Sequence, residues 1–168
     1  DVFLFSGSVS DNISLGRSDI DSAQIERAAR AVEAHAFIER MPQGYGTEIR
    51  ERGTNLSAGQ RQLLSFARAL AHGAQILVLD EATSSIDSET EAMIQNGIHA
   101  LMRDKTAIAI AHRLSTIRDV DRIYVLGKGE LLESGGHSEL VARGGVYSRL
   151  FSLQAKLERA NAEAQPAG

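Results

Sequence analysis

Apolar residues in the first half of the chain recur at the spacing of amphipathic helices. Between Asp21 and about Arg40 they fall every three or four positions, with charged residues between them, which predicts a helix. A second helix, with its first turn near Ser57, is predicted by Leu63, Leu64, Phe66, Ala67 and Leu70. Glycines predict a loop between these helices, and the β-prone run at residues 2–5 predicts an extended segment before them.

Two short apolar runs in the middle of the chain predict neighbouring strands. Residues 76–79 and 106–111 are too short for helices and lack polar alternation, which favours strands buried on both faces of a parallel sheet. Residues 86–101 lie between them and have a helical pattern. The order strand, helix, strand therefore predicts an α/β fold with a parallel sheet.

The last third of the chain predicts a hairpin followed by a helix. Residues 122–126 and 130–133 flank Gly127-Lys128-Gly129, a pattern typical of a hairpin with a three-residue loop. A helical pattern returns from about His137. The apolar face is lost after Leu153, so we expect residues 154–168 to form a fraying helix and a disordered end.

Composition narrows the classes of protein that fit this pattern. The chain has 168 residues, 43% of them hydrophobic and 24% charged, which suits an ordinary domain with a buried core. A net charge of -4 gives no support to nucleic-acid binding, and the absence of cysteine excludes disulfides and thiolate metal sites. No apolar run approaches the ~20 residues that span a bilayer. Because residue 1 is Asp, we expect the chain to begin inside a longer sequence.

The pentapeptide Leu56-Ser57-Ala58-Gly59-Gln60 opens the second predicted helix. A helix start offers free backbone N–H groups and the positive end of the helix dipole, and small residues there let an anion approach closely. This makes the pentapeptide a candidate phosphate site. The alternative is a plain helix cap, in which the Ser57 hydroxyl accepts a hydrogen bond from the amide of Gly59 or Gln60.

Three ionisable residues follow the two predicted strands. Asp80 and Glu81 end the first strand and His112 ends the second, at the edge where parallel sheets place their ligands. Asp80 would hold Mg²⁺ through its water shell, Glu81 would orient or deprotonate an attacking water, and His112 would contact a terminal phosphate or that water. The alternatives are two solvated acids at a strand end and a structural histidine.

Together and in this order, these motifs resemble the ABC ATPase family. The matching segments are Leu56 to Gln60 as the signature, Ile76 to Glu81 as the Walker B strand with its catalytic glutamate, Ser84 to Asp87 as the D-loop, and His112 as the switch histidine. The resemblance extends from Asp1 to about Leu153. Two short segments are similar to the exporter branch of the family in particular: Glu51-Arg52-Gly53 and His112-Arg113-Leu114-Ser115-Thr116.

The resemblance implies a fold, cofactors and partners. The fold would be an α/β P-loop NTPase-type sheet, mostly parallel, flanked by helices and partial. A helical subdomain carrying the signature would occupy about residues 10–72, and the remainder of the catalytic core residues 74–153. The protein would use ATP and Mg²⁺ at the cytoplasmic face of the cell membrane, partnered by a second ATPase domain, in a homodimer or heterodimer, and by a transmembrane domain.

The resemblance also assigns roles to individual residues. Two cassettes would pack head to tail, with Ser57, Ala58, Gly59 and Gln60 closing over the ATP of the partner. Ser85 and Asp87 would lie at the dimer contact. Glu51 would lie in the loop that touches the transmembrane domain.

The chain departs from the family pattern in two respects. It contains no glycine-rich loop ending in Gly-Lys-Ser/Thr, since its single Gly-Lys pair, Gly127-Lys128, is followed by glycine and reads as a turn. The adenine-stacking aromatic and the Q-loop glutamine would precede Asp1. We therefore expect the chain alone to be inactive. Ala58 stands where the commonest form of the family signature has glycine, and we expect function to survive that change.

Two alternative functions remain open. The chain could be a non-catalytic dimerisation or interaction module, because it lacks a phosphate loop. A chromosome-maintenance ATPase would share the sheet and a signature helix, but would also require long coiled-coil arms and a basic DNA surface, and neither pattern is present.

Overall fold

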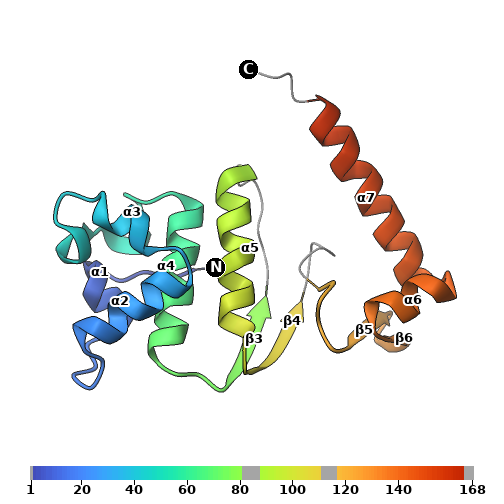
Figure 1. The fold of residues 1–168 in the computed structure, drawn as a ribbon, viewed down its shortest axis with the longest axis horizontal. Helices are drawn as coiled ribbons and strands as arrows, with labels where there is room; N and C mark the ends of the chain where they lie inside the picture. The colour runs from blue at the N-terminus through green and yellow to red at the C-terminus, as the bar shows by residue number, and fades with distance from the viewer. Residues whose placement is uncertain (1, 81–87, 111–116, 165–168) are drawn as a thin grey trace. The chain divides into compact units, whose positions relative to one another are not determined.

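The structure is a computed structural model that describes residues 2–80, 88–110 and 117–164 (Figure 1). It contains two compact units, Asp1–Ile108 and Ala109–Gly168. These units are defined by the contacts within each of them. The boundary between the helical subdomain and the catalytic core, expected near residue 73, stays a prediction. Within the described residues, no helix combines the length and the apolar character that a bilayer span requires.

The first unit is built mainly from helices. Those that the structure describes are α1 (Val9–Ser14), α2 (Ser22–Ala31), α3 (His35–Glu39), α4 (Ala58–Ala71) and α5 (Ser88–Met102). Helix α4 packs against α1, α2 and α5, and Figure 1 shows it between α2 and α5. Its residues Leu63, Leu64 and Ala67 are buried in the core of the unit. Burying each leucine contributes roughly 1.5–3 kcal/mol, so the apolar periodicity of the sequence becomes the packing of α4.

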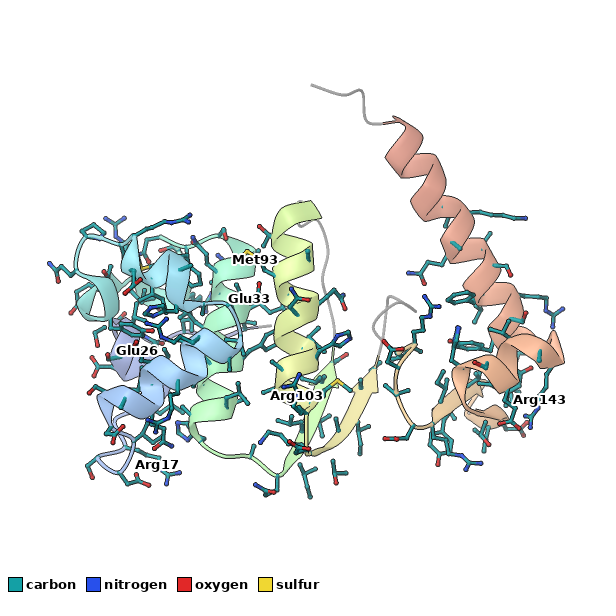
Figure 2. The ribbon with its side chains drawn as sticks, viewed as in Figure 1. Arg17, Glu26, Glu33, Met93, Arg103 and Arg143 are labelled. Carbon is teal, nitrogen blue, oxygen red and sulfur yellow. The ribbon has the colours of Figure 1, made fainter. Side chains whose placement is uncertain are left out.

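The single helix predicted from Asp21 to Arg40 was wrong, because the structure breaks it into α2 and α3. Glu33 lies at the break with a φ of 61°, in the left-handed region that ends a helix. Glu33 is labelled in Figure 2. Its carboxylate accepts a hydrogen bond from Nδ2 of Asn96 in α5 at 3.0 Å. Val32 and Ala34 are both buried, so the apolar spacing continues across a break that it does not reveal.

Short elements connect the first helices. Residues 2–5, predicted to be extended, form no described strand, although Leu4 is fully buried. The strand β1 (Gly7–Ser8) pairs antiparallel with β2 (Glu48–Ile49). The 3₁₀ turns η1 (Gly44–Gly46) and η2 (Glu51–Gly53) occupy the segment predicted to be a loop.

Two parallel strands follow α4 in the chain, one before α5 and one after it. The strands are β3 (Ile76–Asp80) and β4 (Thr106–Ile110), and their arrows point the same way in Figure 1. The Thr106 amide donates to the Gln75 carbonyl at 3.1 Å, which places the two strand starts side by side. The predicted strand–helix–strand order is therefore confirmed.

The prediction that these strands are buried on both faces was wrong for the described structure. Leu77 is 6% exposed and belongs to the apolar cluster that includes residues of α5. On the other face Val78 is 68% exposed and Ile108 58% exposed. The sequence is apolar on both faces, but the described part of the chain covers only one.

The second unit joins a hairpin to two helices. The hairpin pairs β5 (Ile123–Gly127) with β6 (Glu130–Gly135), and the helices are α6 (His137–Arg143) and α7 (Val146–Ala164). The hairpin loop has two residues, not the predicted three, because Gly127 pairs with Glu130. Lys128 and Gly129 have φ values of 52° and 83°, as a type I′ turn requires.

A carboxylate from the hairpin caps α7. Glu133 accepts hydrogen bonds from the amides of Val146 at 2.7 Å and Tyr147 at 3.0 Å. These bonds lower the pKa of the Glu133 carboxyl. A Cβ at Gly145 would lie 1.8 Å from Glu133 Oε1, so a side chain at this position would displace the carboxylate that caps α7. Helix α7 continues to Ala164, so part of the expected tail is helical.

Candidate functional site

The candidate phosphate site lies at the start of α4. Ser57 is the N-cap, and its exposed side chain accepts a hydrogen bond from the Gln60 amide at 3.2 Å. The Gln60 side chain accepts one in return from the Ser57 amide at 3.0 Å, which completes a capping box. The helix cap, given above as the alternative to a phosphate site, is therefore present. It does not exclude an anion site, because helix geometry leaves the amides of Ala58 and Gly59 without an intrahelical acceptor.

Ala58 and Gly59 occupy different environments in the first turn of α4. Ala58 is exposed and is not among the residues with positive φ, so alanine fits there without backbone strain. Gly59 is buried against α5, and a Cβ added to it would lie 2.0 Å from Cγ2 of Thr90. The glycine therefore permits the close approach of the two helices.

Asp80 is the part of the predicted acidic site that the structure describes. It is the last residue of β3, and its side chain is exposed at the carboxyl end of the parallel pair. One carboxylate in this position fits an Mg²⁺ ion that keeps most of its water ligands. Glu81, Ser85, Asp87 and His112 lie outside the described residues.

The loop that carries Glu51 has an unusual backbone. The Glu51 side chain is exposed, and the next two residues, Arg52 and Gly53, have φ values of 58° and 66°. The Arg52 amide donates to the Leu4 carbonyl at 3.1 Å. A Cβ at Gly53 would lie 2.9 Å from side-chain atoms of both Leu4 and Arg61, so this turn requires glycine.

Two arginines on α4 donate hydrogen bonds to backbone carbonyls outside that helix. Arg61 donates through Nη1 to the Leu56 carbonyl at 2.7 Å. Arg68, seven residues further on, donates through Nε to the Asn12 carbonyl at 2.8 Å and through Nη1 to the Phe3 carbonyl at 3.0 Å. Burial lowers the pKa of the Arg68 guanidinium, although arginine stays protonated in proteins.

An open cavity of about 400 Å³ adjoins the segment that Arg68 holds, and its walls are Phe5, Ser6, Asp11, Asn12, Leu15 and Gly16. The Phe3 and Phe5 rings meet edge to face with their centroids 4.9 Å apart. The Arg68 guanidinium carbon lies 5.8 Å from the centroid of the Phe5 ring. Phe3, Phe5 and Leu15 remain exposed, so the surface around the cavity is apolar.

Comparison with known proteins identifies the family. The family model described as ABC transporter matches residues 2–84. The chain is 51% identical over 154 residues to an uncharacterized ABC transporter ATP-binding protein, YknV, of Bacillus subtilis (strain 168), with 92% of the chain aligned. The chain belongs to the ABC transporter family.

Two other similar proteins are named as a flippase and as an exporter. The chain is 50% identical over 160 residues, or 95% of its length, to the ATP-dependent lipid A-core flippase of Syntrophus aciditrophicus (strain SB). It also matches the solved structure of a bacterial Atm1-family ABC exporter with ATP bound, with a TM-score of 0.81 and 40% identity over all of the chain. The resemblance to the exporter branch and the partial P-loop NTPase-type fold are thus confirmed.

The chain spans only about a quarter of each of these ABC transporters. It covers 26% of the Bacillus protein, 27% of the flippase and 28% of the solved exporter chain. The activity, substrates and partners of the whole protein are therefore matters of proposal.

Sequence reasoning located the cap at the start of α4 and missed the contacts behind it. The capping box could be read from Ser57 and from Gln60 three residues later. Arg68 and Asn12 were not singled out, because 56 residues separate them and neither belongs to a motif with a known spacing. Their proximity is a property of the folded unit alone.

Proposed function

We propose that the chain is the signature-bearing and catalytic-carboxylate part of an ABC exporter subunit that hydrolyses ATP to drive transport across a membrane. The observation that carries the proposal is the position of Asp80 at the carboxyl end of β3, in a parallel strand–helix–strand unit, with Glu81 as the next residue in the sequence. Open α/β sheets bind their ligands at this edge. The ABC transporter family membership supports ATP as that ligand.

The proposed mechanism gives each residue of the edge a separate task. Asp80 would hold Mg²⁺ through water, and a bound ion would supply charge neutralisation for the phosphates. Glu81 orients or deprotonates the attacking water, and His112 contacts the terminal phosphate or that water. Phosphoryl transfer depends mainly on positioning and charge stabilisation, so such residues act only once they are assembled around ATP.

The start of α4 acts on ATP held by a second ATPase domain. Ser57, Ala58, Gly59 and Gln60 close over that nucleotide, with the exposed Ser57 and the helix dipole facing its phosphates. Ser85 and Asp87 lie at the contact between the two domains, which form a homodimer or a heterodimer. The site is complete only when the dimer closes, and closure couples hydrolysis to the transmembrane domain.

The loop at Glu51 transmits that closure. Its conformation is constrained by Gly53 and by the bond from Arg52 to Leu4, so a force on Glu51 reaches the segment beside the cavity. We place this loop against the transmembrane domain at the cytoplasmic face of the membrane.

The deciding experiment is Glu81→Gln in the full-length protein. We expect ATP turnover to fall by ~100-fold or more, as for loss of a general base, while ATP-driven dimerisation of the cassettes persists. Glu130→Gln, at an exposed position of β6, is the matched control and should turn over ATP normally. Normal turnover by the Glu81→Gln protein would refute the assignment.

The 168-residue chain by itself should bind ATP weakly and hydrolyse none, because its sequence holds no Gly-Lys-Ser/Thr loop. Titration of the chain with ATP and Mg²⁺, followed by calorimetry and phosphate release, measures both properties. Turnover by this chain alone would show that the phosphate loop is dispensable and would overturn the proposal.

A further inference from the structure

Arg68 joins α4 to a segment that is distant in sequence. Its guanidinium makes three hydrogen bonds, to the Phe3 carbonyl at 3.0 Å, the Asn12 carbonyl at 2.8 Å and Asn12 Oδ1 at 3.3 Å. Two of these acceptors are backbone atoms, so they are present whatever the side chains of the segment are. A hydrogen bond from an ionised donor is stronger than one between neutral groups.

Asn12 makes the segment rigid. Its side chain is 2% exposed, and its Nδ2 donates to the Phe5 carbonyl at 2.9 Å and the Ser8 carbonyl at 3.1 Å. Its Oδ1 accepts from the Phe5 amide at 2.9 Å as well as from Arg68. The buried amide thus has both donors and both lone pairs satisfied, and such fully satisfied networks hold one conformation.

The segment that Arg68 and Asn12 hold, residues 3–12, forms part of the cavity wall. Phe5 and Asn12 line the cavity, and Phe5 also lies under the Arg68 guanidinium. Arg68 therefore bonds both the backbone and the side chain of Asn12, a residue of the cavity wall. A displacement of Asn12 would weaken these two bonds or move α4.

Ser57 caps the N-terminal end of α4. Eleven residues separate Ser57 from Arg68, which is about 16 Å along a helix axis, and an uninterrupted helix of that length moves as a rigid rod. We propose that Arg68 is a positioning residue, which fastens the cavity wall to α4 so that displacement of the wall moves Ser57. This inference rests on the proposed function of Ser57 at the ATP of a second domain.

A double-mutant cycle in the full-length transporter tests the inference. ATPase rates at saturating ATP are measured per folded protein for Arg68→Met, Ser57→Ala and the double variant. We expect Arg68→Met to slow the normal protein about tenfold, since it removes charge-assisted bonds, but to slow the Ser57→Ala protein less than about twofold, since coupled residues are not additive. Arg27→Met, on the exposed side of α2, is the matched control and should not change the rate.

A merely structural arginine would give a different pattern. Arg68→Met would then reduce the rate by the same factor with and without Ser57→Ala, and that result would overturn the inference, as would an unchanged rate. If Arg68→Met does not fold, the cycle is run with Arg68→Lys, which keeps the charge but loses the fork of donors and should give an intermediate rate. If Ser57→Ala alone leaves the rate unchanged, the proposed function of Ser57 fails, and the inference with it.

Discussion

Gly59→Ala should disturb the packing of α4 on α5. The added Cβ would lie 2.0 Å from Cγ2 of Thr90, whereas carbon atoms in contact need about 3.5–4.0 Å. One of the two helices, or the Thr90 side chain, must therefore move by about 1.5 Å or more. Overpacking of this kind costs about 1–3 kcal/mol, so the free energy of local opening of the two helices should fall by that amount.

A second substitution isolates the contact that causes the loss. Thr90→Ser removes Cγ2 and keeps the hydroxyl, and the remaining neighbours of the new Cβ are Thr90 Cβ at 3.5 Å and Ile94 Cδ1 at 3.6 Å, which are ordinary contacts. In the Thr90→Ser protein we expect Gly59→Ala to cost less than about 0.5 kcal/mol. Hydrogen exchange of the α4 and α5 amides in the full-length protein measures the opening free energies.

The ATPase rates of the same four proteins separate packing from phosphate contact. If glycine is needed only for helix packing, Thr90→Ser should restore both stability and rate to Gly59→Ala. If an approaching phosphate needs the space, stability returns and the rate does not. An equal stability loss in both Thr90 backgrounds, or no loss in either, would refute the packing argument.

Two further predictions concern the caps and the signature. Glu133 has a pKa held below its usual 4.5 by its bonds to the Val146 and Tyr147 amides, so its stabilisation of α7 is present above pH 4.5 and is lost as the pH falls through the lowered value. Exchange of those two amides should quicken at that acid pH, and Glu133→Gln should quicken it at neutral pH. Ala58→Gly should change the ATPase rate of the full-length protein less than about twofold, because Ala58 already has helical φ and costs no strain; a several-fold gain would contradict this.

Local signals in the sequence predicted the elements that depend on near neighbours. The capping box places the start of α4 at Ser57, because both of its hydrogen bonds join residues three positions apart. The apolar runs predicted β3 and β4, because a short run without polar alternation has few other structures open to it. The glycines around Lys128 predicted a hairpin, although its loop has two residues instead of three.

Features that depend on distant neighbours were not predicted. The break at Glu33 carries no glycine or proline, and is held by Asn96, 63 residues away. The helix α1 was not predicted, since its six residues show too little periodicity, yet Val9 and Ile13 are fully buried. The site residues Glu81, Ser85, Asp87 and His112 lie outside the described residues, so their roles stay predictions.

The sequence by itself determined the family and the strand–helix–strand order of β3, α5 and β4, because these reside in residue types at short, regular spacing. Only the tertiary structure decided why Gly59 is glycine and what Arg68 holds. Thr90 and Asn12 come close to them through the folding of α5 and α1 around α4. The spacing of apolar residues predicts which face of a helix is buried, but packing in the folded protein decides which atoms meet across that face.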